Sequence, residues 1–232
     1  MEQIAVVTGA NRGIGLEISA RLADLGFTVV FTSRDEAKGL KAMNGLLKSG
    51  RKFVFFKLDV TNKTDGRKLY EFLEKEYGRV DVLFNNAAIL PDENESAVAV
   101  DLSVVSKTFE TNTIGAFMVA QSVIPLMKKN NYGRIINISS GLGALSSMGG
   151  GYPAYRISKA SLNAITRMLA DELSNSNILV NSVDPGWVKT DMGGPNASKT
   201  TAEAVDSILW LAQLPENGPS GKFFRNKQEA PW

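Results

Sequence analysis

Two residue types are missing from this chain of 232 residues, which contains no cysteine and no histidine. The absence of cysteine excludes disulfide scaffolds and thiol nucleophiles, and the two absences together exclude zinc sites built from these residues. Proton transfer by an imidazole is excluded as well. Any proton transfer therefore falls to tyrosine, lysine, aspartate or glutamate, and we expect no metal site.

Long apolar runs and an excess of one charge are also missing. No stretch approaches the length of a membrane span, and "MEQIAVVTGA" enters an apparent strand at once, without the features of a signal or transit peptide. The 26 basic and 24 acidic residues give a net charge of +2 and no extended basic face. We therefore expect a cytoplasmic protein that binds neither membranes nor nucleic acid.

The chain does contain short β-branched runs that alternate with longer helical patterns. The runs are "IAVVT", "TVVFTS", "KFVFFKLDV", "VDVLFNN", "GRIINISS" and "ILVNSVDPG", each separated by room for a helix. This alternation predicts βαβ units and a parallel sheet with helices on both faces. A last run, "GKFFRN", is expected at the sheet edge, and residues 91–96 and 184–199 are expected to be loops near a site. Residues 1–232 are expected to form a single domain.

The stretch "VVTGANRGIGLEI" places Gly9, Gly13 and Gly15 between the first strand and the first helix. Glycine is needed where a chain turns sharply and where its backbone approaches a pyrophosphate at a helix N-terminus. The spacing differs from the common dinucleotide fingerprint, and turn geometry alone is the alternative. Because the motif follows the first strand of a βαβ chain, it favours a bound nucleotide.

The end of the second strand indicates which nucleotide is bound. Enzymes that use NAD commonly place an acid there, whereas this chain has "FTSRDE", with Ser33 followed by Arg34. The guanidinium of Arg34, with Arg12 from the glycine loop, suits the 2′-phosphate of NADP(H), and the alternative is two solvated surface arginines. Asp59, at the third strand end, is expected beside the adenine, and a turn cap is its alternative role.

The stretch "GGGYPAYRISK" holds two tyrosines, each with a cation four residues downstream. The pairs are Tyr152 with Arg156 and Tyr155 with Lys159. Both pairs share a helix face if the helix has begun by the tyrosine. Pro153 disfavours helical geometry at Tyr152 and suits a first helical turn, so we expect Tyr152 outside the helix and Tyr155 within it.

Five motifs in order point to a known family. "TGANRGIG", "NNAA" at residues 85–88, "NISS", "YRISK" and "DPGWVKTDM" together resemble the short-chain dehydrogenase/reductase family, from about residue 3 to the C-terminus. Within the family the chain most resembles the NADPH-dependent carbonyl reductases, through Arg12, Arg34 and the ending "GPSGKFFRNKQEAPW". The resemblance implies a Rossmann-type doubly wound α/β sheet of about seven strands, in the order 3-2-1-4-5-6-7.

The resemblance also implies roles for four residues. Tyr155 is the expected proton donor, and Lys159, together with an oxidised nicotinamide, is expected to lower the pKa of the phenol from its ordinary value of about 10. Lys159 is further expected to bond the nicotinamide ribose, Ser140 the substrate carbonyl, and Asn112 a water of a proton relay. The alternatives are an exposed helix face for the first pair, a turn for Ser140, and a backbone-bonding kink for Asn112.

One spacing conflicts with this assignment. The family commonly has about thirteen residues between its serine and its tyrosine, which Ser139 and Tyr152 match, whereas Ser140 and Tyr155 are fifteen apart. Three consecutive glycines, residues 149–151, form a loop that can hold two extra residues. We therefore keep Tyr155 as the acid, with Tyr152 as a pocket wall or core aromatic.

The residues expected to hold NADP(H) lie in these motifs and at the strand ends. They are Gly9, Asn11, Arg12, Gly13, Ile14, Gly15, Arg34, Asp59, Val60, Asn86, Ala87, Tyr155, Lys159, Pro185, Gly186, Val188 and Thr190. The backbone of Val188 and the hydroxyl of Thr190 are expected to bond the carboxamide, and the glycines that follow are expected to let a substrate lid move.

The expected function is NADPH-dependent reduction of an aldehyde, ketone or quinone. Leu142, Leu145, Trp187 and Met192 are candidates for an apolar pocket, with ordinary core packing as the alternative. The alternative functions are a family member acting on a specialised alcohol, such as a sugar, steroid or acyl thioester, and a non-catalytic NADP(H)-binding sensor.

The expected oligomeric state depends on a segment that this chain lacks. The chain lacks the long insertion that monomeric animal members carry before the catalytic tyrosine, which favours a homodimer through residues 108–129 and the helix after Tyr155. The carbonyl-reductase-like ending favours a monomer, and the homodimer is the expectation that we carry forward.

Overall fold

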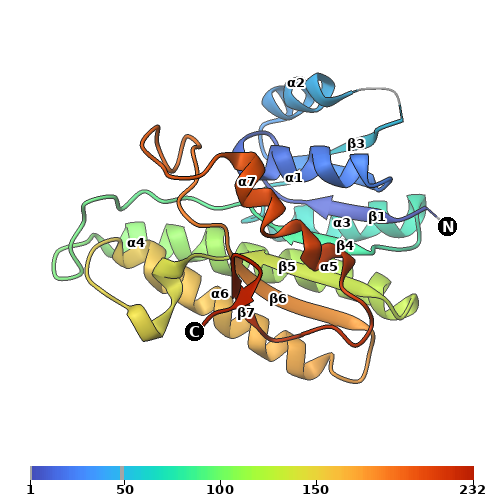
Figure 1. The fold of residues 1–232 in the computed structure, drawn as a ribbon. Helices are drawn as coiled ribbons and strands as arrows, with labels where there is room; N and C mark the ends of the chain where they lie inside the picture. Colours follow the sequence, from blue (N-terminus) through green and yellow to red (C-terminus); the bar gives the residue numbers. More distant parts are fainter. Residues whose placement is uncertain (1, 48–49) are drawn as a thin grey trace.

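The computed structural model describes residues 2–47 and 50–232 of the chain, and its strands form one sheet in the order β3-β2-β1-β4-β5-β6-β7-β8 (Figure 1). The strands are β1 (Ile4–Val7), β2 (Thr28–Ser33), β3 (Lys52–Lys57), β4 (Val82–Asn85), β5 (Gly133–Ile138), β6 (Ile178–Asp184), β7 (Phe223–Arg225) and β8 (Gln228–Glu229). Neighbours from β3 to β7 pair in parallel, and β7 pairs with β8 antiparallel. The predicted order of the first seven strands is confirmed.

The eighth strand corrects the prediction that "GKFFRN" forms the sheet edge. After β7 the chain turns through Asn226 and Lys227, whose φ angles are 51° and 65°. Two consecutive residues with positive φ suit a two-residue hairpin, because the twist of such a turn matches that of the strands. β8 then pairs Gln228 with Arg225 and covers β7. A strand of two residues has no readable period, which is why the sequence pattern misses it.

The described residues form seven α-helices. They are α1 (Gly13–Asp24), α2 (Glu36–Leu46), α3 (Lys63–Glu76), α4 (Leu102–Phe109), α5 (Gly115–Lys129), α6 (Pro153–Glu172) and α7 (Thr201–Asp206). A π-helical turn, Glu110–Ile114, joins α4 to α5, and short 3₁₀ turns cover Gly141–Gly143, Leu145–Ser147 and Leu209–Gln213. In this part of the chain no helix is both long enough and apolar enough to span a membrane.

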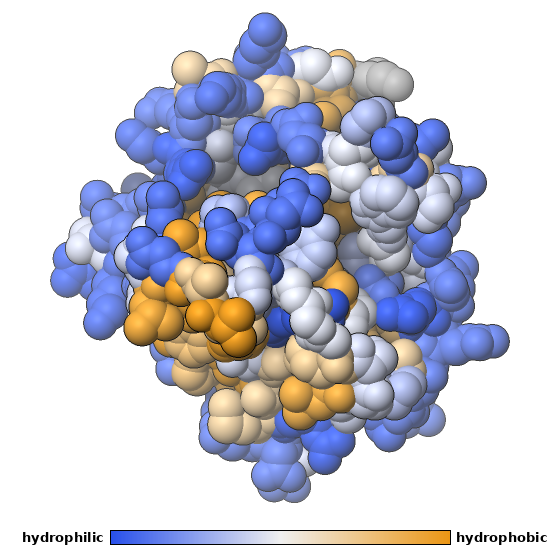
Figure 2. All heavy atoms as spheres, turned by 90° about the vertical axis from the view of Figure 1, so that its left-hand side faces the viewer, coloured by the Kyte–Doolittle hydropathy of each residue, from blue (hydrophilic) through white to orange (hydrophobic). Residues whose placement is uncertain are grey.

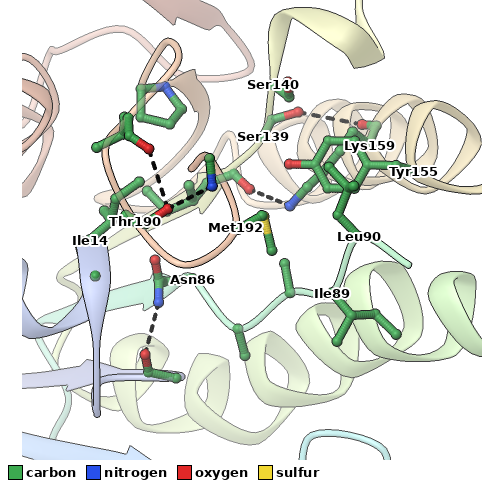
Figure 3. Close-up of a pocket in the computed structure, with 18 of the residues that line it drawn as sticks. Ile14, Asn86, Ile89, Leu90, Ser139, Ser140, Tyr155, Lys159, Thr190 and Met192 are labelled. Atoms are coloured by element: carbon green, nitrogen blue, oxygen red, sulfur yellow. Dashed lines mark hydrogen bonds between the residues drawn. The ribbon is translucent and has the colours of Figure 1, made fainter. Parts of the chain in front are cut away.

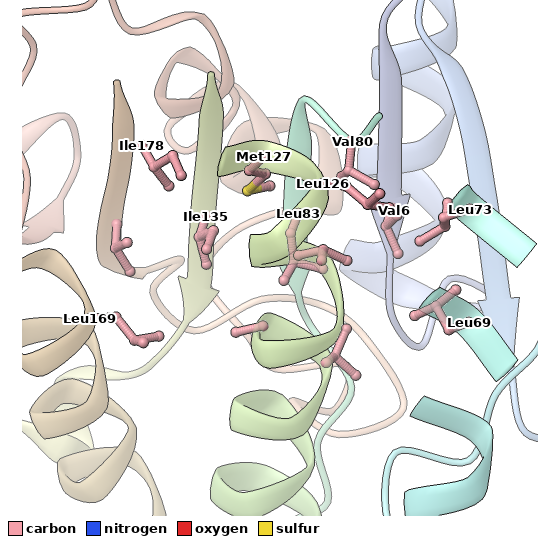
Figure 4. Close-up of a cluster of buried hydrophobic side chains, with 14 of the residues drawn as sticks. Val6, Leu69, Leu73, Val80, Leu83, Leu126, Met127, Ile135, Leu169 and Ile178 are labelled. Carbon is pink, nitrogen blue, oxygen red and sulfur yellow. The ribbon is translucent and has the colours of Figure 1, made fainter. Parts of the chain in front are cut away.

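The strand β1 shows how the sheet separates two hydrophobic cores. Its four residues are all buried, and neighbouring residues point to opposite faces. Ile4 and Val6 join a cluster with side chains of α3, α5 and α6, including Leu73, Leu126 and Leu169 (Figure 4). A strand that is covered on both faces must be apolar throughout, which explains the continuous run in the sequence.

The opposite face of the sheet carries the second cluster. There Ala5 and Val7 pack with Ile18 and Leu22 of α1, and with Val205 of α7. Side chains of α2 pack against the same cluster. Helices therefore cover both faces of one mostly parallel sheet (Figure 1), and the predicted doubly wound α/β fold is confirmed.

The loops after the parallel strands gather at one side of the sheet, on the left in Figure 1. Parallel strands bring their carboxyl ends to the same edge, which is where open α/β sheets bind ligands. Residues 91–96 contain neither helix nor strand, as predicted. Residues 185–199 contain one isolated bridge, between Val188 and Lys199, which ties the two ends of this loop together.

Candidate active site

The glycine loop after β1 packs closely against the segment that follows β4. Gly9 and Gly13 have φ angles of 62° and 56°, which disfavour other residues. A Cβ atom added to Gly15 would lie 2.5 Å from the side-chain nitrogen of Asn86, and one added to Gly9 would lie 3.0 Å from the backbone of Ala87. The glycines are therefore required by the packing of the loop as well as by its turn.

The N-terminus of α1 opens beside this loop. Its N-cap residue, Arg12, makes no side-chain cap, and the first turn contains no acidic residue. The first backbone N–H groups of a helix have no partner within the helix, so an uncapped N-terminus attracts an anion. Arg12, Gly13 and Ile14 all line the main cleft of the molecule. This geometry fits a pyrophosphate.

Thr8 is a residue of the site that the sequence interpretation missed. Its hydroxyl accepts hydrogen bonds from the backbone N–H groups of Asn86 (2.9 Å) and Ala87 (3.0 Å). The side-chain amide of Asn86 donates to the backbone oxygens of Thr8 (2.9 Å) and Gly9 (3.1 Å). Asn86 is labelled in Figure 3. Thr8 thus joins the ends of β1 and β4. The available signal was its place directly before the first glycine of the motif.

Two arginines and an aspartate line the far end of the cleft. Arg34 and Asp59 face it from the ends of β2 and β3. Burial opposes ionisation of Asp59, but hydrogen bonds from Thr61 and the charge of Arg34 outweigh it and lower its pKa. Arg12 also lines the cleft, but its guanidinium pairs with Asp191, 2.7 Å away. Both members of that pair are exposed, so the pair is weak and Arg12 can exchange partners.

The two tyrosines lie on opposite sides of the start of α6, as Pro153 predicts. Tyr152 precedes the helix with a φ angle of 53°, and Tyr155 is the third helical residue. Tyr155 is buried, with 7% of its surface exposed, and lies beside Ser140 and Lys159 (Figure 3). Both tyrosines line the cleft.

The pKa of Tyr155 differs in direction from the prediction. Burial raises the pKa of the phenol, the carboxylates of Asp184 and Asp92 raise it further, and only the polar contact with Ser140 opposes this change. Desolvation is the largest effect on this phenol, and it acts against the lowering expected from the charge of Lys159. A phenol with a raised pKa stays protonated at neutral pH, which suits a proton donor.

Lys159 is itself altered by its surroundings. Its side chain is buried, its ammonium group donates to the backbone oxygen of Ile138 at 2.7 Å, and it lies 5.5 Å from the centre of the Tyr155 ring. Burial lowers the pKa of Lys159 to about 7. At neutral pH the lysine therefore carries only part of a charge, which weakens its influence on the phenol.

The two adjacent serines point in different directions. The Ser139 hydroxyl donates to the side-chain oxygen of Asn163 at 2.7 Å, away from Tyr155. The Ser140 hydroxyl faces the cleft and accepts the backbone N–H of Leu142 at 3.1 Å. Ser140 is thus both a turn residue and the serine that faces Tyr155, so the two interpretations of this residue are compatible.

Asn112 lies in the π-helical turn between α4 and α5, and its side chain is fully occupied. Its oxygen accepts the N–H of Ile89 (2.8 Å), while its amide donates to the Ile89 oxygen (2.8 Å) and to Ser158 (3.1 Å). These side-chain contacts agree with the backbone-bonding alternative, and the relay water stays a prediction. Asn112 fixes the segment after β4 to α6, the helix that carries Tyr155.

The loop after β6 forms the remaining wall. Pro185, Gly186, Val188 and Thr190 all line the cleft, and Gly186 has a φ angle of 82°. The Thr190 hydroxyl donates to the Val188 oxygen at 3.3 Å and accepts the N–H of Gly193 at 3.1 Å. The Val188 backbone and the Thr190 hydroxyl, which are expected to bond a carboxamide, are therefore adjacent.

The four apolar candidates for the substrate pocket differ in their positions in the structure. Trp187 and Met192 line the cleft although 57% and 42% of their surfaces are exposed, which excludes ordinary core packing. Leu142 lines the cleft too, whereas Leu145 is exposed on the surface. The cleft holds about 920 Å³ and opens on the face shown in Figure 2, where apolar residues gather beside a hollow.

Comparison with known proteins decides the family. A family model described as short chain dehydrogenase matches residues 3–201. The chain belongs to the short-chain dehydrogenase family. Such a dehydrogenase from Saponaria officinalis, short-chain dehydrogenase/reductase 1, is 32% identical, with 100% of this chain and 96% of the relative covered. Carbonyl reductase (NADPH) 1 from Mus musculus is 33% identical, with 99% and 98% covered.

Solved structures of the same family agree with the fold of this short-chain dehydrogenase. An NADPH-bound carbonyl reductase from chicken fatty liver superposes with a TM-score of 0.89 at 29% identity, covering 100% of this chain and 99% of the other. The carbonyl reductase Sniffer of D. melanogaster gives 0.87 at 32% identity and covers 100% of both chains. The predicted resemblance to carbonyl reductases is confirmed, and membership supports an oxidoreductase.

Two further groups in this short-chain dehydrogenase site were not predicted. Arg156 donates to the backbone oxygens of Gly151 (2.8 Å), Gly150 (3.1 Å) and Leu142 (3.3 Å), so it holds the three-glycine loop rather than acting on Tyr152. No local pattern distinguishes such a residue from a cation that acts on a neighbouring phenol.

The second unpredicted group is an ion pair at the carboxyl ends of β6 and β7. The Nε of Arg225 lies 2.6 Å from a carboxylate oxygen of the buried Asp184, and both residues line the cleft. The other oxygen of Asp184 accepts the N–H of Gly186 at 2.9 Å. The pair joins two strands 41 residues apart, so no local signal in the sequence indicates it.

Proposed function

We propose that this protein is an NADPH-dependent carbonyl reductase that acts on an aldehyde, ketone or quinone. The observation that carries the proposal is a buried Tyr155 beside Ser140, in a cleft whose other end holds an uncapped helix N-terminus and Arg34. NADPH, when bound, supplies the hydride for the carbonyl carbon. The carbonyl reductases from mouse and chicken fatty liver, which are named for NADPH or carry it, support this choice of cofactor.

The residues of the cleft fit this cofactor. Gly9, Asn11, Gly13, Ile14 and Gly15 form the close turn and the helix N-terminus suited to its pyrophosphate. We assign Arg34, with Arg12 after release from Asp191, to the 2′-phosphate.

The other assignments follow the walls of the cleft. Asp59 and Val60 would lie beside the adenine, Asn86 and Ala87 beside the central part of the dinucleotide, and Pro185, Gly186, Val188 and Thr190 beside the nicotinamide.

Tyr155 gives its proton to the substrate oxygen as negative charge develops there. The raised pKa keeps the phenol protonated at neutral pH, so the donor is ready before substrate enters. Ser140 donates a hydrogen bond to the same oxygen, and Lys159, with a pKa of about 7, can return a proton to the phenolate. Asn112 keeps α6 in place against the segment after β4.

The substrate end of the cleft is mostly apolar. Ile89, Leu90, Leu142, Trp187 and Met192 line it, so recognition depends on apolar area more than on a required charge. Such a lining fits aldehydes, ketones and quinones.

The test is oxidation of NADPH by the purified protein against a panel of aldehydes, ketones and quinones, with NADPH binding measured in parallel by calorimetry. We expect turnover with apolar carbonyl compounds and its loss in Tyr155→Phe. Tight NADPH binding without turnover of any carbonyl compound would instead support the non-catalytic sensor.

Assembly and location complete the proposal. We assign the protein to the cytoplasm and propose a homodimer formed through α5 and α6, because the chain lacks the long insertion before Tyr155. Light scattering at micromolar concentration should give the mass of two chains, and a mass near 25.1 kDa would overturn the dimer.

A further inference from the structure

Asp92 is buried in a loop whose other residues face water. Its exposed surface is 0%, whereas its neighbours Pro91 and Glu93 are exposed. One carboxylate oxygen accepts the backbone N–H of Tyr155 at 3.2 Å, across 63 residues of chain. A carboxylate is costly to bury, so an acid in this place needs a compensating contact.

The helix α6 supplies that contact because its own N-terminus lacks a cap. A helix normally receives its cap from the N-cap side chain, which bonds the N–H of the second or third helical residue. Here the N-cap residue is Tyr152, which makes no such bond, and Tyr155 is the third helical residue. Asp92 therefore takes the place of the missing cap, and the N–H that it binds belongs to the proposed proton donor.

Among the residues that the structure describes, Asp92 forms no ion pair. Its second carboxylate oxygen is buried and has no hydrogen-bond partner within the described ranges 2–47 and 50–232. Asp184, the other carboxylate that faces Tyr155, forms an ion pair with Arg225. The remaining groups that face the tyrosine are Lys159 on the same helix and Ser140 at the end of β5. The Asp92 carboxylate thus lies at the start of α6, where the helix dipole favours negative charge.

We propose that Asp92 is a positioning residue for Tyr155, which its carboxylate holds through the backbone N–H so that the side chain stays against Ser140. This inference rests on the proposed function, because it assigns Tyr155 as the acid. The negative charge has a second effect, since it favours the neutral phenol and raises its pKa.

The experiment compares Asp92→Ala, which removes the acceptor, with Asp92→Asn, which keeps an acceptor oxygen and removes the charge. Asp101 provides the matched control, because its carboxylate caps α4 by accepting the N–H of Ser103 at 2.8 Å, outside the cleft. The readouts are amide hydrogen exchange at Tyr155, kcat and KM with one apolar aldehyde, and the pH profile of kcat.

Amide exchange tests the contact without needing turnover. In Asp92→Ala we expect the Tyr155 amide to exchange at least about tenfold faster, because a hydrogen-bonded amide becomes free. Asp101→Ala should raise exchange at Ser103 and leave Tyr155 unchanged. An unchanged Tyr155 amide in folded Asp92→Ala would overturn the inference even if the protein reduces no carbonyl compound.

Steady-state kinetics test whether the contact with Asp92 affects catalysis by Tyr155. We expect kcat to fall about ten- to a hundredfold in Asp92→Ala with KM changed less than about threefold, and Asp92→Asn to recover most of the loss. In Asp92→Asn the alkaline limit of kcat should move to lower pH, because a negative charge near the phenol is gone. If Asp92→Asn recovers none of the kcat lost in Asp92→Ala, or if Asp92→Ala keeps kcat within twofold, the positioning role is wrong. An unchanged alkaline limit in Asp92→Asn would overturn the effect of the charge on the phenol.

Discussion

The proposed cofactor end of the cleft is built mostly from one short stretch of chain, whereas the proposed catalytic end is assembled from segments far apart. Residues 8–15 supply the turn, the close approach and the helix N-terminus, with Asn86 as their main distant partner. Tyr155 instead depends on Ser140, Asp184 and Asp92, from three other segments. A short motif can therefore identify the first end, but the chemical state of the second depends on tertiary packing.

The largest effect should come from removing the proton donor alone. We expect Tyr155→Phe to lower kcat by about two to four orders of magnitude, because only the phenolic proton is lost. NADPH affinity, measured by calorimetry, should stay within about threefold of wild type. A parallel loss of NADPH binding would show that the two ends of the cleft are not separable.

The second prediction concerns the cofactor end. Arg34→Ala should weaken NADPH binding about ten- to a hundredfold and leave NADH binding almost unchanged, because one charge-assisted phosphate contact is removed. Arg12→Ala should lower NADPH affinity less than Arg34→Ala does, because Arg12 must first leave Asp191 before it can bind the phosphate. Equal affinity of the wild type for NADPH and NADH would contradict the assignment to a 2′-phosphate.

The third prediction concerns pH and stability at the catalytic end. The folded-state pKa of Lys159 is about 7, below its ordinary value of 10.5, so the folded protein binds fewer protons between these limits and its stability rises with pH. Burying the charged amine of Lys159 lowers the free energy of unfolding. This cost is fully present below about pH 7 and disappears as the pH rises towards 10.5. Relative to Lys159→Met, wild type should gain roughly 1.4 kcal/mol of unfolding free energy per pH unit in that window.

Urea unfolding of both proteins at pH 7 and pH 9 checks this prediction. The exposed Lys128 offers a control, since Lys128→Met should follow wild type at both values. A difference between wild type and Lys159→Met that does not change with pH would show that Lys159 keeps an ordinary pKa.

The smallest effect is expected at the other tyrosine. Tyr152→Phe keeps the ring that lines the cleft and should change kcat/KM less than about tenfold, mainly through KM. Arg156→Met should also act mainly on KM, because it releases the glycine loop without touching Tyr155. If Tyr152→Phe abolishes reduction while Tyr155→Phe remains active, the acid and its serine must be reassigned to Tyr152 and Ser139.

The same contrast explains what the sequence could predict. The strand order, the requirement for Gly9 and Gly13, and the position of Tyr155 inside its helix follow from local backbone rules, and the structure confirms them. The spacing of fifteen between Ser140 and Tyr155 is accommodated by the glycine loop that Arg156 holds.

The errors arise where distant segments meet. Burial raises the pKa of Tyr155, opposite to the effect expected from Lys159 and an oxidised nicotinamide, and it depends on loops that no local pattern places. Thr8, Asp92 and the pair of Asp184 with Arg225 were missed because their partners lie 41 or more residues away. The side-chain bonds of Asn112 to Ile89 and Ser158 were likewise not visible in the sequence, whereas its role in holding a relay water stays a prediction.

Transfer of a label from NADPH to the alcohol product tests most directly whether the protein is a reductase with Tyr155 as its proton donor. NADPH deuterated at its transferable position is incubated with the protein and an apolar aldehyde, and the alcohol is examined by mass spectrometry. We expect wild type and Tyr152→Phe to form alcohol that carries the deuterium, and Tyr155→Phe, although it binds NADPH, to form almost none. Alcohol without the label, or labelled alcohol formed equally well by Tyr155→Phe, would contradict this expectation.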